Sequence, residues 1–138
     1  MKVNLSRKND KVLFEIKNSD GASSLVDGSA EIGGVNGAAR PKELLLGAIA
    51  SCSAFEVKNI LEKQKQPLKD IAVEVSGDRE SNGTAKPFSK IDVTFIVMGN
   101  VELKKAERAA SLAIEKYCSV KSSLDPKIIV NYSVRIEK

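Results

Sequence analysis

Histidine is absent from the 138 residues of this sequence. Its absence excludes Ser-His-Asp and Cys-His catalysis, and it removes the side chain that most often binds metals in proteins. Only two cysteines are present, Cys52 and Cys118, and they fall short of the four ligands of a structural zinc site. We therefore expect no metal centre.

Aromatic residues are also scarce, with four phenylalanines and two tyrosines. None of them forms a stacking pattern, and the basic residues are interleaved with acidic ones, so the net charge of +4 indicates a mildly basic solvated surface rather than a nucleic-acid interface. No run of about 18 apolar residues is present, and residues 1–17 alternate like strands rather than a signal peptide. We expect no membrane segment and a cytoplasmic location, where two cysteines are thiols or a catalytic or sensing pair.

The patterns that the sequence does contain predict an α+β fold in a single domain of residues 1–138. Apolar residues that alternate with polar ones predict strands, and apolar residues at three- and four-residue spacing predict helices. Asn100 is the expected N-cap of the second helix, and residues 77–88 are an expected polar connection. The expected order is strands at 3–5, 12–17 and 24–27, a helix at 41–64, strands at 71–75 and 91–97, a helix from about 101 to Cys118, and a strand at 128–136.

A stretch rich in glycine and alanine, residues 28–40, precedes the first helix. Glycines permit close approach of the backbone and mobility. The stretch is therefore either a plain surface loop or a loop that covers a pocket.

The first helix is apolar on every side over its first half. Pro41 opens it, in the position where the missing N–H costs nothing. A helix that is apolar all round is buried all round, and a chain of this size has little protein with which to surround it. We therefore expect a second copy of the chain to complete the burial, which makes the protein a homodimer. The apolar residues of this half are Leu44, Leu45, Leu46, Ala48, Ile49, Ala50, Ala54 and Phe55.

Three stretches resemble the OsmC/Ohr family, the organic hydroperoxide resistance and osmotically inducible protein C-like proteins. RPKELLLGAIASC at residues 40–52 is similar to the central-helix motif of the family, and EKYCSV at residues 115–120 is similar to its second-cysteine motif. SKIDVTFIVMG at residues 89–99 fits the strands between them. The sequence around both cysteines more closely resembles a less characterised branch of this family.

This resemblance implies an OsmC-like fold, β-β-β-α-β-β-α-β with a long buried central helix, in an intertwined homodimer with two active sites at the subunit interface. It also implies reduction of organic hydroperoxides without a cofactor, with electrons from an external dithiol. Cys52 matches the nucleophile of the family and Cys118 the resolving thiol. The fold of the family would bring the two together although they are far apart in the sequence.

The resemblance extends less clearly to the groups that would support a thiolate. Burial raises the pKa of a thiol, so a cation is expected to offset it. Family members carry an arginine before the central helix or in an early loop. Arg40 is therefore one candidate, with Arg7 and Arg79 as the others.

Glu43 is the second candidate for the site. Some family members place a carboxylate directly after the helix-opening proline, where this chain has Lys42 and the acid follows one residue later. At about 100° per residue, a straight helix places Glu43 on the side opposite Cys52. Either Gly47 permits a bend, or Glu43 has another task, such as an interaction with the helix dipole.

Three functions are compatible with these observations. The first is a homodimeric thiol peroxidase that uses Cys52, Cys118, Glu43 and Arg40 on organic hydroperoxides. The second is a binding protein for a small apolar ligand, in which the cysteines take no part. The third is a redox sensor that changes shape when the cysteine pair is oxidised.

Overall fold

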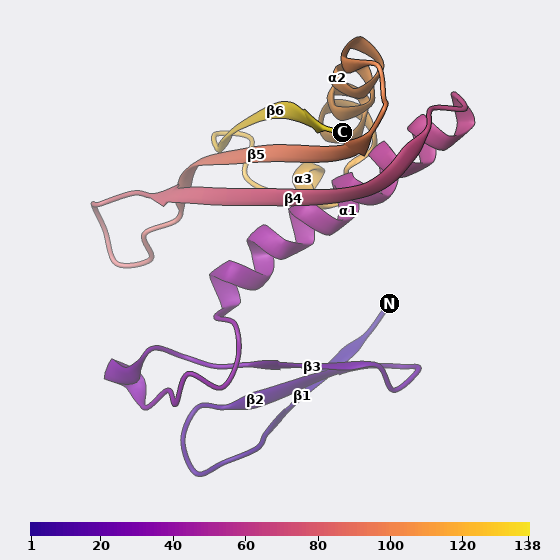
Figure 1. Cartoon of the computed structure of the whole chain (residues 1–138). Coiled ribbons are helices and arrows are strands. Elements are labelled where there is room, and N and C mark those ends of the chain that lie inside the picture. Colours follow the sequence, from indigo (N-terminus) through magenta and orange to yellow (C-terminus); the bar gives the residue numbers. More distant parts are fainter. The chain divides into compact units, whose positions relative to one another are not determined.

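The computed structural model describes all residues from 1 to 138 (Figure 1). The predicted α+β order of three strands, a helix, two strands, a helix and a strand is confirmed. The chain divides into two compact units, Met1–Leu45 and Leu46–Lys138. Each unit is described by itself below, and the expectation of a single domain stays a prediction.

The first unit is built on a three-stranded antiparallel sheet. Its strands β1 (Val3–Arg7), β2 (Phe14–Asn18) and β3 (Ser23–Val26) follow one another in sequence order. Asparagine side chains close both hairpins, because Asn9 Oδ1 accepts two main-chain N–H groups in the first turn and Asn18 Oδ1 accepts two in the second. The register places the apolar side chains Val3, Leu5, Phe14, Ile16 and Val26 on one face of this sheet.

The glycine-rich stretch after β3 is ordered around one buried carboxylate. Asp27 is only 2% exposed, and it accepts hydrogen bonds from the N–H groups of Gly28 at 2.8 Å and of Val35 and Gly37 at 3.0 Å. The Gly37 N–H, together with those of Gly28 and Val35, holds the pKa of the Asp27 carboxyl below its ordinary value, although burial acts in the opposite direction. The loop, which includes the short 3₁₀-helix η1 (Ala30–Ile32), is therefore fixed at both ends to a single side chain.

Helix α1 (Pro41–Lys63) buries one stripe rather than all of its sides. Its fully buried residues recur at four-residue spacing: Ile49, Ser53, Val57 and Leu61. Phe55, on another side, is 65% exposed. The prediction of burial on every side is thus not met within one chain, because a single chain supplies too little protein to cover the remaining sides. The dimer that the sequence predicts remains a prediction.

The apolar length of α1 also bears on the membrane. By length and composition alone, this helix would be able to cross a bilayer, contrary to the expectation from apolar runs. One such helix is weak evidence, because core helices of soluble proteins and signal sequences meet the same criterion.

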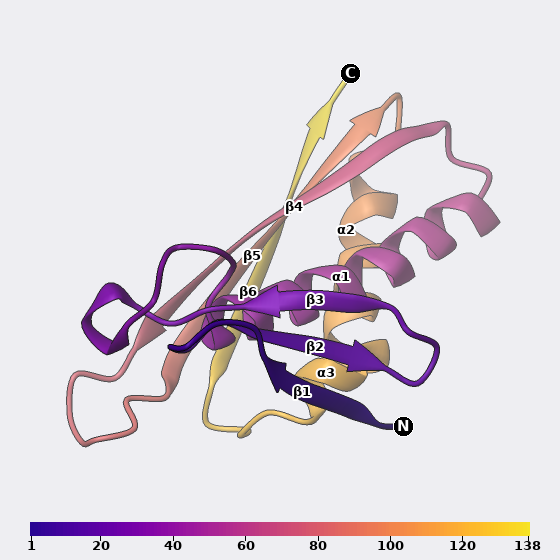
Figure 2. The same ribbon diagram turned by 90° about the horizontal axis from the view of Figure 1, so that it is seen from below.

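The second unit contains another three-stranded sheet, with β5 in the middle (Figure 2). Strands β4 (Leu68–Arg79) and β5 (Phe88–Gly99) are antiparallel, whereas β6 (Ile129–Glu137) pairs with β5 in parallel. Both long strands extend further than the alternating pattern predicts, so residues 77–79 and 88 of the expected connection belong to strands. Gly77 makes this extension possible, since a Cβ there would lie 2.5 Å from the ring of Phe88.

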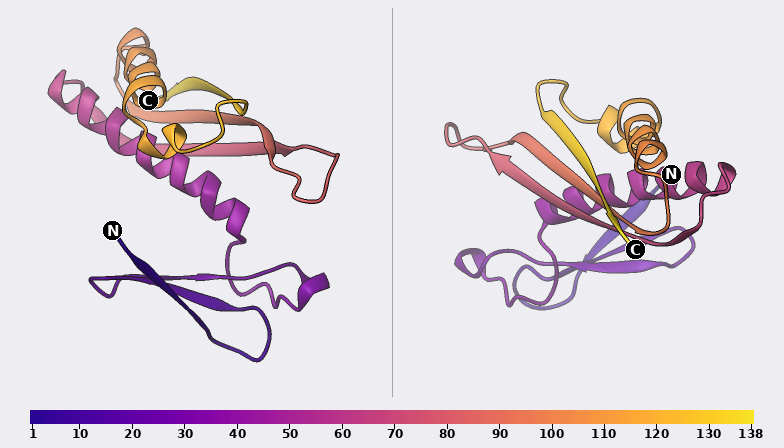
Figure 3. Two further views of the ribbon diagram at one scale, coloured as in Figure 1. Left: turned by 180° about the vertical axis from the view of Figure 1, so that it is seen from behind. Right: turned by 45° about the horizontal axis from the view of Figure 1, so that its top comes forward.

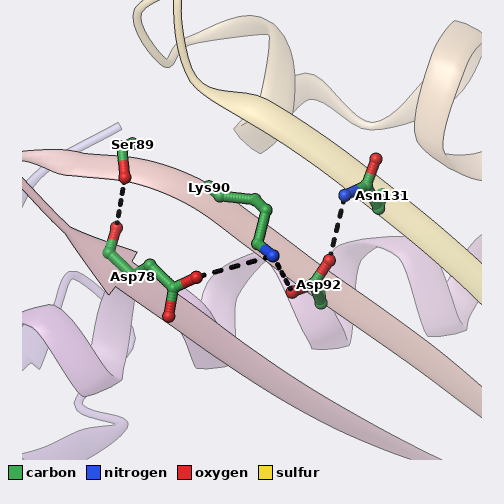
Figure 4. Close-up of polar contacts among 5 residues, drawn as sticks. All are labelled: Asp78, Ser89, Lys90, Asp92 and Asn131. Atoms are coloured by element: carbon green, nitrogen blue, oxygen red, sulfur yellow. Dashed lines mark hydrogen bonds and ion pairs between the residues drawn. The ribbon is translucent and has the colours of Figure 1, made fainter.

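The outer face of this sheet is polar and charged. Lys90 Nζ lies 3.4 Å from a carboxylate oxygen of Asp92 and 3.6 Å from one of Asp78 (Figure 4). Asn131 Nδ2 donates to Asp92 at 3.0 Å, and Ser89 donates to the main-chain oxygen of Asp78 at 3.1 Å. Asp92, followed by Asp78, raises the pKa of Lys90 above its ordinary value. These cross-strand contacts between exposed polar groups help to keep β5 in register with its neighbours.

The inner face is covered by helices (Figure 3). Side chains of β5 at alternate positions are fully buried there, namely Ile91, Val93, Phe95 and Val97. The crossover from β5 to β6 consists of α2 (Leu103–Leu112), the five-residue π-helix η2 (Ala113–Tyr117) and α3 (Ser119–Ser122). The predicted N-cap Asn100 is wrong: the N-cap is Glu102, whose N–H is taken by Gln66 Oε1 at 3.0 Å, so the turn before the helix uses two more residues than expected.

Candidate thiol site

Cys52 lies in the middle of α1, at the border of its buried stripe. Each helical residue is rotated by about 100° from the one before, so Cys52 flanks the line formed by Ile49 and Ser53. Its side chain is accordingly half-buried. The hydroxyls of Ser51 and Ser53 on either side donate to main-chain oxygens one turn earlier in α1, so the Cys52 thiol takes its contacts from outside the helix.

Cys118 ends the π-helix η2 and begins α3. Its own backbone is extended, with φ −73° and ψ 99°, so the chain turns at this residue. The preceding π-turn is joined to β6, because Tyr132 Oη donates to Glu115 Oε1 at 2.8 Å. Cys118 is 1% exposed, and its sulfur accepts the N–H of Lys121 at 3.3 Å as the N-cap of α3.

The second unit brings these two cysteines into contact, although 66 positions separate them (118 minus 52). Both are free thiols, and each shifts the pKa of the other. Ser119 Oγ lies 4.0 Å from the Cys52 sulfur, and the Lys121 N–H donates to the Cys118 sulfur at 3.3 Å. Main-chain hydrogen bonding by Ser119 and Val120 acts on the pKa of Cys52 as well.

These hydrogen bonds move the pKa values of the two thiols apart. Partial burial raises the pKa of Cys52, but the N–H of Val120, the Cys118 thiol and both donors of Ser119 outweigh it, so the pKa lies below that of an ordinary cysteine. Burial raises the pKa of Cys118, and the neighbouring Cys52 raises it further against the N–H of Lys121. Between the two pKa values the pair consists of a thiolate at Cys52 and a thiol at Cys118, which is the protonation state of a nucleophile beside a hydrogen-bond donor.

The charged candidates lie elsewhere in the chain. Arg40 and Glu43 belong to the first unit, where the Arg40 N–H donates to Glu43 Oε1 at 2.9 Å and Glu43 thus caps the start of α1. Arg7 ends β1, and Arg79 ends β4, where its Nε donates to the main-chain oxygen of Lys86 at 3.1 Å. This hydrogen bond gives Glu43 a contact at the helix start, and both alternatives for the residue stay predictions. A role for Arg40 or Glu43 in chemistry at Cys52 stays a prediction.

Comparison with known proteins places this arrangement in a family. The sequence profile of the family described as "OsmC-like protein" matches residues 34–133, a range that contains both cysteines. The chain belongs to the OsmC-like family. The family that the cysteine motifs predict is thereby confirmed. Protein YhfA of Escherichia coli strain K12 is a relative, 33% identical over 122 residues that cover 87% of each chain.

Solved OsmC-like structures have the same fold. A hypothetical protein from Aquifex aeolicus is 33% identical and superposes with a TM-score of 0.79, covering 99% of this chain and 97% of that one. An organic hydroperoxide resistance protein OsmC from Legionella pneumophila is 19% identical, with a TM-score of 0.70 over 97% of this chain and 96% of that one. At the latter identity the likeness concerns the fold alone.

Two residues of this OsmC-like site escape prediction from the sequence. Ser119 and Val120 supply donors to Cys52, and the available signal was their place directly after Cys118 in the motif EKYCSV. Main-chain N–H groups do not depend on the identity of the side chain, so a search of the sequence for charged groups does not find them. No group of three or more cysteine, aspartate or glutamate side chains is arranged to hold a metal ion.

Proposed function

We propose that this protein reduces organic hydroperoxides with its cysteine pair and so protects the cell against oxidative stress. The observation that carries the proposal is the contact between a thiol of lowered pKa, Cys52, and a buried second thiol, Cys118. A thiolate is the form of cysteine that attacks peroxides, and a second thiol in contact with it traps the product. The Legionella pneumophila protein, which shares the fold, is named an organic hydroperoxide resistance protein, and the proposal assigns the same chemistry to this chain.

The proposed reaction has three steps. The Cys52 thiolate attacks one peroxide oxygen, the O–O bond breaks, and the alkoxide that leaves takes a proton to become an alcohol. Cys52 is then a sulfenic acid, and Cys118 attacks its sulfur as a thiolate, so that a disulfide forms and the sulfenic oxygen leaves as water after protonation. An external dithiol reduces the disulfide to two thiols and is itself oxidised to a disulfide.

Exposed apolar side chains support the homodimer that belongs to the proposal. Val3 and Leu5 on the sheet of the first unit are 61% and 57% exposed, and Phe55 of α1 is 65% exposed, which favours a homodimer that covers these apolar groups. A reducing cytoplasm would keep the pair ready for use. Arg40 and Glu43 are retained as candidate groups that act on the bound peroxide.

A direct assay tests this function. Peroxide consumption is measured with cumene hydroperoxide and excess dithiothreitol for the intact protein, Cys52→Ser and Cys118→Ser. The intact protein should consume peroxide over many turnovers, Cys52→Ser should be inactive, and Cys118→Ser should stop after about one turnover. Consumption by Cys52→Ser at the rate of the intact protein would refute the role of this thiol.

The exposure of Phe55 also favours a second candidate, a binding protein for a small apolar ligand. An exposed aromatic ring one turn from Cys52 offers apolar surface that a ligand can bury. In this case the double variant Cys52→Ser, Cys118→Ser should bind a fluorescent fatty acid as tightly as the intact protein, and neither should turn over peroxide. A redox sensor differs from both, because one oxidation should suffice and excess reductant should give no sustained consumption.

A further inference from the structure

Ser119 is a second side chain directed at the sulfur of Cys52. Its Oγ lies 4.0 Å from Cys52 Sγ, at the limit of a hydrogen bond to sulfur. Ser119 directly follows Cys118 and is exposed, so its hydroxyl has no structural task in the core. The main-chain oxygen of the same residue accepts the hydroxyl of Ser123 at 2.8 Å, which fixes the backbone from which the side chain extends.

The donors around Cys52 are all uncharged. The main-chain N–H groups of Ser119 and Val120 and the thiol of Cys118 are the other three, and each is fixed by the fold. A hydroxyl differs from these in that it rotates, so it can follow the sulfur as its charge changes. It is also the one donor in this set that a substitution can remove without affecting either cysteine or the main chain.

We propose that Ser119 positions the Cys52 thiolate, with its hydroxyl as a hydrogen-bond donor to the sulfur beside the N–H groups of Ser119 and Val120. Peroxide reduction by this thiolate rests on the proposed function, whereas stabilisation of the thiolate by Ser119 does not depend on it. Charge-assisted hydrogen bonds to a thiolate are stronger than those to a thiol, so the donor favours the ionised form.

The test measures thiolate formation without any peroxide. The reduced full-length protein reacts with iodoacetamide between about pH 5 and pH 10, a range that spans ordinary thiol titration, and peptide mass spectrometry follows the rate at Cys52 alone. Ser119→Ala and Ser119→Gly remove the hydroxyl in two ways, and Ser119→Thr retains it. Ser122→Ala is the matched control, since Ser122 is an exposed serine of the same short helix.

Ser119→Ala and Ser119→Gly should react about three- to tenfold more slowly at pH 7, the range expected for the loss of one ordinary hydrogen bond, because the 4.0 Å contact is long and the hydroxyl is exposed. At alkaline pH their rates should rejoin that of the intact protein, whereas a distorted site would stay slow at every pH. Ser119→Thr and Ser122→Ala should keep the original pH profile. A profile unchanged in Ser119→Ala, or shifted equally in Ser122→Ala, would overturn the proposal.

The same assay separates this inference from the proposed function. If the Ser119 variants shift the pH profile but the intact protein does not consume peroxide, the inference stands and the peroxidase proposal fails. If the intact protein consumes peroxide and the Ser119 variants keep the original pH profile, the peroxidase proposal stands and the inference fails.

Discussion

Oxidation of Cys52 and Cys118 to a disulfide should stabilise the folded protein. Each of the two thiols shifts the pKa of the other, so they lie near each other and we expect the new bond to require little movement of the backbone. It closes a loop of 66 residues (118 minus 52). In the chain-entropy treatment of unfolded chains, a loop of that length is worth about 4 kcal/mol at 25 °C.

The weakening of hydrogen bonds to the two sulfurs opposes this gain in stability. The N–H groups of Ser119, Val120 and Lys121 now point to sulfurs that become poorer acceptors in a disulfide. Ser119 is exposed, so water can replace part of what is lost. With a loss of up to about 2 kcal/mol, we expect a net gain of about 2 to 4 kcal/mol, which corresponds to an increase of about 4 to 16 °C in Tm for a protein of this size.

The measurement compares urea unfolding of the reduced protein and of the protein treated with one equivalent of cumene hydroperoxide. Intact mass spectrometry must first find a loss of two hydrogens, and both samples need the same protein concentration, because association contributes to stability. Cys118→Ser treated in the same way is the control and should gain no stability. A confirmed disulfide with an unchanged or lower unfolding midpoint would refute the reasoning, since it would mean that bonding the sulfurs distorts the fold.

Further expectations concern the site, the assembly and the loop. Without its resolving thiol, Cys118→Ser should accumulate Cys52 that carries two or three oxygens under repeated peroxide treatment, and intact mass spectrometry detects this gain. A variant that stays unmodified would show that Cys52 is not the group that reacts with peroxide. The purified protein should sediment as a dimer at micromolar concentration, and a clean monomer of about half that mass would remove the basis of the interface. Bulky alkyl hydroperoxides should be turned over faster than hydrogen peroxide, because each buried CH₂ contributes about 0.8 kcal/mol; Phe55→Ser should reduce that preference, whereas equal rates for both peroxides would argue against an apolar site. The pKa of Asp27 is lowered in the folded protein, so its stabilisation of the loop at 28–40 is present at neutral pH and is lost as the pH falls below about 4. Amide exchange in this loop should therefore be slow at neutral pH and fast in acid, and Asp27→Asn should already exchange fast at neutral pH. Exchange in Asp27→Asn as slow as in the intact protein would show that the carboxylate is dispensable.

The order of elements could be predicted because each has a strong periodic signal. The strands of the second sheet alternate between buried and solvated residues, and Pro41 marks the start of α1. Boundaries were harder where the backbone continues to pair regardless of side-chain polarity, as at Gly77 and Phe88. The short π-helix before Cys118 has no sequence signal, because its hydrogen-bond pattern depends on how η2 joins α3 and β6.

The two cysteines of the site could be predicted from the sequence, but the groups that lower the pKa of Cys52 could not. The two cysteine motifs gave Cys52 and Cys118, and the resemblance to a family gave their proximity. The search for a cation led to Arg40, whose role stays a prediction, and it did not find the groups that lower the pKa of Cys52, namely Val120, Cys118 and Ser119. Main-chain groups are common to every residue, so only a structure can assign them.

The parallel pairing of β5 with β6 has a consequence for synthesis of the chain. Parallel strands need a crossover, and Cys118 lies on it, near its end. A nascent chain presents Cys52 to the cell well before Cys118 has been made, and at that stage the thiol lacks every donor that follows residue 117. The contacts that lower the pKa of Cys52 therefore form only after the crossover has been made, late in the completion of the fold.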